Sequence, residues 1–192
     1  MKRPTVDTVI DFIAEIFERR GAESYLGDAV TMSAHMLQSA ANAGRAGAPP
    51  AEIAAALLHD IGHYAGEFPE DMIEAGADNR HDAVGARILE PFFPPAVVEP
   101  VRLHVAAKRY LCTVDPSCGT RLSQASVETL RLQGGPMAPA EIARFESEPH
   151  REAAVRVRMW DDDGKTVGAT PPPPQLAHYI PLLRSLLAGS RK

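Results

Sequence analysis

The sequence has no apolar run near the roughly 20 residues that a membrane-spanning helix needs, and it has only two cysteines, Cys112 and Cys118. Two cysteines cannot make a disulfide framework, so we interpret them as free thiols, with weak metal ligation as the alternative. The first residues, MKRPTVDTVIDF, lack the apolar stretch of a signal peptide. We therefore expect a soluble cytoplasmic protein that has no membrane partner.

The sequence also lacks an excess of positive charge, because its formal net charge is −5 at pH 7. A nucleic-acid partner is therefore not expected, although a local positive pocket is compatible with this total. The chain has 192 residues, of which 45% are hydrophobic and 23% charged. This composition suits one globular domain rather than a disordered segment.

Strand-like alternation of apolar and polar residues is missing as well, whereas helical spacing is found along the whole chain. An apolar stripe that includes Ile13 and Phe17 is closed by Gly21. Pro50 stands at the expected first position of a helix that opens AEIAAALLHDIGHY. The other predicted helices cover residues 27–42, 81–90, 95–110, 123–132, 139–145, 148–160 and 176–187. Pro171–Pro174 cannot be helical and predict an extended spacer, and the sequence as a whole predicts an all-α fold.

The pair His59 and Asp60 follows the apolar run AAALL, which places two ionisable groups where loss of solvation is costly. Buried charge generally survives by pairing or by binding a metal ion. A histidine that is hydrogen-bonded inside the core is the alternative for His59. Further candidates stand in neighbouring predicted helices, and they are His35, His81, His104 and Asp161.

This order, H…HD…H…H…D, resembles the pattern of HD-domain metalloproteins over about residues 25–165. Neutral imidazoles and carboxylates suit iron, manganese or zinc. Four ligands would hold one ion, whereas six ligands with a carboxylate able to bridge indicate two ions, with Asp60 as the natural bridge. The resemblance implies one ion on His35, His59, Asp60 and Asp161, and a second ion on Asp60, His81 and His104. Asp162 and Asp163 are the alternatives to Asp161 as the last carboxylate ligand. Asp161 is favoured because it matches the family's position after the Trp.

Four segments, ESYLGDAVTMSAHMLQSA, RYLCTVDPS, LSQASVETLRLQGGPM and RVRMWDD, resemble the PhnZ-type diiron oxygenases of organophosphonate breakdown. The resemblance implies an HD-domain helical bundle over residues 1–170, with the spacer and last helix of 171–192 on the same domain. It implies two iron ions as a mixed-valent Fe(II)/Fe(III) pair, O2 as co-substrate, and no catalytic side chain beyond the metal ligands. Such enzymes split the C–P bond of a 1-hydroxy-2-aminoethylphosphonate into phosphate and an amino acid, so a hydroxylase is implied upstream.

An anion site beside the metal ions is supported by helical spacing. Lys108 follows His104 by four residues, His63 follows His59 by four, and Arg158 precedes Asp161 by three. Three hydrogen-bonding side chains, at 126, 129 and 133, share one helix face. A phosphonate needs such a set of donors. By the resemblance, the candidate phosphonate contacts are His63, Lys108, Ser126, Thr129, Gln133 and Arg158, and ordinary surface or capping roles are the alternative.

The amino end of the substrate, opposite the phosphonate, calls for a carboxylate and an aromatic face. Asp28 lies seven residues before His35, and Tyr25 lies one turn further. PhnZ-type enzymes usually carry Glu where this chain has Asp28, and the loss of one methylene withdraws the carboxylate by roughly 1.3–1.5 Å. We therefore predict room for a trimethylammonium group.

The predicted reaction is oxidation of 1-hydroxy-2-(trimethylammonio)ethylphosphonate to glycine betaine and phosphate. One alternative is the same reaction on 1-hydroxy-2-aminoethylphosphonate, which gives glycine. A second is a metal-dependent HD phosphohydrolase, which needs the same ligands and anion pocket but no O2. A third is a catalytically silent HD domain that binds a ligand and signals.

Overall fold

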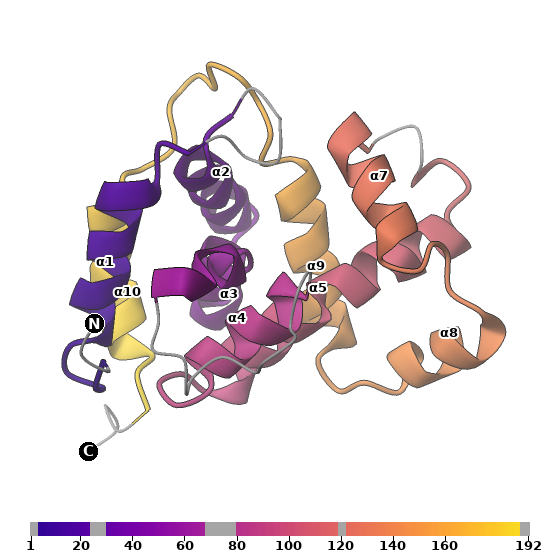
Figure 1. Cartoon of the computed structure of the whole chain (residues 1–192), viewed down its shortest axis with the longest axis horizontal. Coiled ribbons are helices and arrows are strands. Elements are labelled where there is room, and N and C mark those ends of the chain that lie inside the picture. The colour runs from indigo at the N-terminus through magenta and orange to yellow at the C-terminus, as the bar shows by residue number, and fades with distance from the viewer. Residues whose placement is uncertain (1–3, 24–29, 68–79, 119–121, 189–192) are drawn as a thin grey trace.

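The computed structural model describes residues 4–23, 30–67, 80–118 and 122–188 (Figure 1). These residues form helices and no strand, which confirms the predicted all-α fold. The α-helices are α1 (Val9–Arg20), α2 (Met32–Arg45), α3 (Pro50–Leu58), α4 (His81–Leu89), α5 (Pro95–Val114), α7 (Gln124–Leu132), α8 (Pro139–Glu146), α9 (Arg151–Asp162) and α10 (Leu176–Ser185). A short 3-10 helix, η1 (Ile61–Glu67), lies between α3 and α4.

Helix α3 is the central helix of the fold. It contacts α2, α5, α9 and α10, and every residue from Ala54 to Leu58 is fully buried. A helix that is apolar on all sides is stable only inside a core, which explains why the run AAALL stands there. The residues that follow α3, His59 and Asp60, consequently enter the middle of the protein.

The sequence predicted Pro50 correctly as the start of α3, but the regular helix ends sooner than the segment AEIAAALLHDIGHY suggested. It stops at Leu58, and the chain continues as η1 with a non-helical Tyr64. The cause is a close approach between η1 and α4. A Cβ atom at Gly62 would lie 2.0 Å from the carbonyl oxygen of His81, so only glycine fits there.

The first and last helices lie side by side at one edge of the molecule, and α10 also contacts α3 (Figure 1). Tyr179 and Leu183 of α10 are buried in the main core. The segment Pro171–Pro174 before α10 is not helical, as predicted. No helix among the described residues combines the length and the hydropathy that crossing a membrane requires.

The prediction that Cys112 and Cys118 are free thiols is wrong, because the structure joins them in a disulfide. Helix α5 continues to Val114, past the predicted end at residue 110. The chain then turns, with the amide of Cys118 donating to the carbonyl of Asp115 over 3.0 Å. This turn brings the two cysteine Cα atoms to 4.9 Å, a separation that sequence spacing did not reveal.

Candidate metal centre

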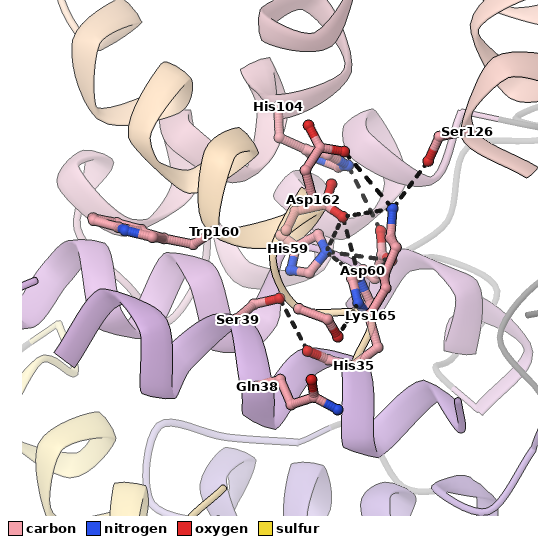
Figure 2. Close-up of polar contacts among 12 residues, drawn as sticks. His35, Gln38, Ser39, His59, Asp60, His104, Ser126, Trp160, Asp162 and Lys165 are labelled. Carbon is pink, nitrogen blue, oxygen red and sulfur yellow. Dashed lines mark hydrogen bonds and ion pairs between the residues drawn. The ribbon is translucent and has the colours of Figure 1, made fainter. Parts of the chain in front are cut away.

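Six buried or nearly buried side chains converge from different parts of the chain, and Figure 2 labels His35, His59, Asp60 and His104 among them. His35 comes from α2, His104 from α5 and Asp161 from the end of α9, while His81 is the first residue of α4. His59 and Asp60 stand in the short link between α3 and η1. The structure therefore brings together all six residues that the sequence singled out as metal ligands.

The carboxylate of Asp60 lies between two groups of imidazoles. Its Oδ2 is 3.3 Å from Nε2 of His59 and 3.6 Å from Nε2 of His35. Its Oδ1 is 3.4 Å from Nε2 of His81 and 3.6 Å from Nε2 of His104. Each oxygen thus faces one pair of histidines, which is the arrangement that a bridging carboxylate requires.

The final carboxylate, Asp161, faces the first of these pairs. Its Oδ1 lies 3.3 Å from Nε2 of His35 and 3.9 Å from Nε2 of His59. The two aspartates that follow it have other surroundings: Asp162 pairs with the guanidinium of Arg158, and Asp163 is exposed. Of the three consecutive aspartates, Asp161 is therefore the one that faces the histidines.

The backbone fixes which nitrogen of each ring faces inward. The Nδ1 atoms of His35, His59 and His104 lie 3.1, 2.8 and 2.7 Å from carbonyl oxygens. Because a carbonyl only accepts, each Nδ1 carries the proton and donates it. In the neutral rings, each Nε2 then presents a lone pair to the interior. This is the tautomer that a metal-binding histidine adopts.

The facing lone pairs provide a test of whether the residues fit metal ions. Nε2 of His35 and Nε2 of His59 are 3.1 Å apart, and those of His81 and His104 are 3.0 Å apart. Two acceptors this close repel unless a cation or a proton lies between them. Ligand atoms about 2.1 Å from a common ion, at right angles to each other, are about 3.0 Å apart. In addition, Asp60 Oδ2 is buried without a hydrogen-bond partner among the described residues. The residues therefore fit two ions that share Asp60.

Electrostatics keep the carboxylates ready to bind a cation. Burial would raise the pKa of Asp60, but the imidazoles of His59 and His35 hold it well below its usual range. Burial would likewise raise the pKa of Asp161, but Arg158 and Lys165 hold it well below. Both groups are therefore anions at neutral pH.

The surroundings of the histidines shift their pKa values in different directions. Burial lowers the pKa of His81 to about 4 and lowers that of His104 well below its usual value. Burial also opposes a charge on His35, yet the adjacent carboxylates of Asp161 and Asp60 raise its pKa to about 9. Without metal, His35 consequently holds a proton at neutral pH, whereas His81 and His104 are neutral and ready to act as ligands.

The predicted phosphonate contacts lie around this centre on α5, α7, α9 and η1. The ammonium of Lys108, buried in α5, donates to Thr129 of α7 over 3.0 Å. Burial and then the nearby Arg158 lower the pKa of Lys108 to about 8. Arg158 itself is buried and donates to Asp161 over 2.5 Å. Ser126 is buried as well.

Two further candidates carry buried polar atoms without hydrogen-bond partners among the described residues, namely Nε2 of His63 and Oε1 of Gln133. The ring of His63 stacks on that of His81, with centroids 4.3 Å apart. Both atoms could therefore take a ligand. Tyr25 and Asp28, which were predicted to face the cationic end of the substrate, lie outside the described residues.

One residue at this site was missed by sequence reasoning. Lys165 follows α9, and its ammonium lies 3.3 Å from Oδ1 of Asp161 and 2.9 Å from the hydroxyl of Ser126. The available signal was its spacing of four residues from Asp161. Because α9 ends between the two residues, helical spacing did not justify using it.

Comparisons with known proteins agree with this geometry. The model of the HD domain family matches residues 32–115. The 1-hydroxy-2-(trimethylamino)ethylphosphonate dioxygenase (glycine-betaine-forming) of Leisingera caerulea is 43% identical over 192 residues, which cover 97% of each chain. Hydroxymethylphosphonate dioxygenase of Gimesia maris is 44% identical over 165 residues, which cover 85% of this chain and 82% of that protein. The chain therefore belongs to the HD-domain phosphonate dioxygenases of the PhnZ type.

Proposed function

We propose that this protein uses O2 to split the C–P bond of 1-hydroxy-2-(trimethylammonio)ethylphosphonate, with glycine betaine and phosphate as products. The observation that carries this choice is the extent of the resemblance to the glycine-betaine-forming relative, which covers 97% of both chains. The resemblance to the hydroxymethylphosphonate enzyme covers less of each chain. The two histidine pairs on either side of Asp60 support the same chemistry.

We propose that the two ions are iron and that they form a mixed-valent Fe(II)/Fe(III) pair. Their ligands would be His35, His59, Asp60 and Asp161 for one ion, and Asp60, His81 and His104 for the other. When bound, the pair supplies the activation of O2 and the oxidation of C1. The protein supplies geometry, because backbone carbonyls orient the rings of His35, His59 and His104 with Nε2 directed inward before metal arrives.

The phosphonate end of the substrate would be held by cations and by donors. Lys108 and Arg158 are buried cations beside the ligand Asp161, and charge-assisted hydrogen bonds to a phosphonate are strong where water is scarce. The remaining contacts would orient the oxygens, and they are His63, Ser126, Thr129 and Gln133. Because His35, His59 and Asp60 are 1% exposed or less, the reacting carbon would be oxidised away from bulk water.

The cationic end would lie against Tyr25 and Asp28. A trimethylammonium group cannot donate hydrogen bonds, so charge and aromatic surface must hold it. An Asp at this position, shorter than a Glu by one methylene, would leave more space for three methyl groups. A hydroxylase acting at C1 must supply this substrate, since the hydroxyl is already present when it binds, and we expect both reactions in the cytoplasm.

Substrate preference tests the proposal directly. Iron-loaded protein should be assayed for phosphate release from the trimethylammonio, the primary-amine and the hydroxymethyl phosphonates, each with and without O2. We expect the highest kcat/KM for the trimethylammonio compound and no release without O2. Preference for either other phosphonate would overturn the substrate assignment, and release without O2 would instead indicate cleavage of the C–P bond by water, which needs no oxidant.

A further inference from the structure

Lysine is rare in this sequence, and the distribution of the four lysines is informative. Lys2 and Lys192 belong to the terminal residues outside the described part, so only Lys108 and Lys165 can be placed. Both point to α7: Lys108 donates to Thr129 over 3.0 Å, and Lys165 donates to Ser126 over 2.9 Å. The two described lysines therefore meet one helix face, three residues apart.

Lys165 also reaches the metal centre. Its ammonium lies 3.3 Å from Oδ1 of Asp161 and 3.9 Å from Oδ1 of Asp162. Figure 2 shows the ammonium of Lys165 between the carboxylate of Asp162 on one side and the hydroxyl of Ser126 on the other. The side chain is only 10% exposed, so this cation stands at the border between the metal centre and α7.

The backbone on both sides of Lys165 is held against α2. The carbonyl of Gly164 accepts from Nδ1 of His35 over 3.1 Å. Thr166 exchanges two hydrogen bonds with the side-chain amide of Gln38, at 3.0 and 3.1 Å. Because these contacts fix the chain before and after Lys165, the direction of its side chain is set before a ligand arrives. Such preorganisation favours binding.

The local charge balance indicates an anionic ligand. Lys108, Arg158 and Lys165 converge on the carboxylates of Asp161 and Asp162. In the proposed function, the charge of Asp161 is directed to a metal ion, so this carboxylate then compensates the neighbouring cations less. Buried cations are stabilised by an anion with several acceptor oxygens.

We propose that Lys165 is a third cationic contact of the phosphonate group, and that it holds one phosphonate oxygen together with the hydroxyl of Ser126. This inference rests on the proposed function, because it assigns a further residue to the same substrate. Lys108 would hold the group from α5, and Lys165 would hold it from the segment after α9. Two ammonium groups that meet the same face of α7 would thus fix the phosphonate relative to the metal ions.

The test compares Lys165→Met with the charge-conserving Lys165→Arg. Arg184→Met is the matched control, since it removes a cation that pairs with Asp11 on α1, away from the site. Titration calorimetry with methylphosphonate, which lacks the 1-hydroxyl, measures binding without turnover. We expect Lys165→Met to keep its iron but to weaken methylphosphonate binding roughly 10- to 100-fold, as for loss of a charge-assisted hydrogen bond. Its KM should rise similarly while kcat changes less, and Lys165→Arg should recover most of the affinity.

Two results would overturn the inference. One is wild-type affinity for methylphosphonate in Lys165→Met. The other is loss of bound iron in that variant, which would mean that Lys165 acts by holding Asp161. If circular dichroism shows that the methionine variant has lost its helices, Lys165→Gln takes its place with the same expected results. The binding measurement needs no O2, so it decides the role of Lys165 even if none of the candidate phosphonates is turned over.

Discussion

The close approach of η1 to α4 predicts that one methyl group will remove one metal ion. In Gly62→Ala, the new Cβ would lie 2.0 Å from the carbonyl oxygen of His81 and 2.8 Å from the amide nitrogen of Gly85. Both neighbours are backbone atoms, so no side chain can turn aside. To reach even 3.0 Å from that oxygen, the start of α4 must retreat by about 1 Å, whereas metal ligands tolerate deviations of only about 0.2 Å.

The displaced residue is His81, whose Nε2 lies 3.4 Å from Oδ1 of Asp60 and 3.0 Å from Nε2 of His104. We therefore expect Gly62→Ala to keep the ion near His35 and to lose the ion near His104. Iron should fall from about two ions per chain to about one, and phosphate release should fall about 10- to 100-fold. Overpacking should also cost about 1–3 kcal/mol of stability.

Elemental analysis gives the iron content, calorimetry gives Tm, and a phosphate assay gives activity. Gly66→Ala is the matched control, because it lies in the same 3-10 helix and its Cβ would meet no atom within 4 Å. Gly66→Ala should behave like wild type. A Gly62→Ala protein with two ions and full activity would refute the reasoning, since α4 would then have another way to accommodate the methyl group.

Three other perturbations have definite expected outcomes. Asp60→Ala should lose both ions, whereas His81→Ala should lose one, and elemental analysis that finds equal losses would contradict the shared carboxylate. Because the adjacent carboxylates of Asp161 and Asp60 raise the pKa of His35 to about 9 despite its burial, iron must displace a proton at pH 7. Iron binding should therefore weaken about tenfold for each pH unit below 9, until protons on other ligands compete with iron more strongly than the proton on His35. Competition with a chelator measures this affinity. Glu52 of α3 pairs with the half-exposed Arg156 of α9 over 2.7 Å. Glu52→Gln should therefore lower Tm by about 2–4 °C, which corresponds to about 1 kcal/mol of stability. An unchanged Tm in calorimetry would show that this ion pair does not stabilise the fold.

Local sequence patterns predicted the elements whose causes are local. Pro50 and the alanine–leucine run indicated a buried helix, and the structure buries all of Ala54–Leu58. The ligand set could be named because the order of its members along the chain resembles the pattern of HD-domain metalloproteins. His59 and Asp60 were informative because costly ionisable groups follow directly after that buried run.

Contacts between distant segments could not be predicted in this way. The end of α3 depends on the carbonyl of His81, which approaches Gly62 from another helix. The position of Lys165 depends on hydrogen bonds to α2 that link residues more than 120 positions apart. The disulfide of Cys112 and Cys118 depends on a turn after α5. The first two contacts join segments that are distant in the sequence, outside the window in which helical periodicity carries information. The disulfide joins cysteines with a sequence separation of 6, but it depends on where α5 ends, which that periodicity did not locate.

The most direct test of the central claim is the ratio of O2 consumed to phosphate released when iron-loaded protein acts on 1-hydroxy-2-(trimethylammonio)ethylphosphonate. An oxygen electrode and a phosphate assay on the same sample give this ratio. A shared-carboxylate iron pair that oxidises C1 predicts one O2 for each phosphate, and no phosphate under nitrogen. Phosphate released without O2 consumption would contradict the account, because the same histidines and aspartates would then serve hydrolysis.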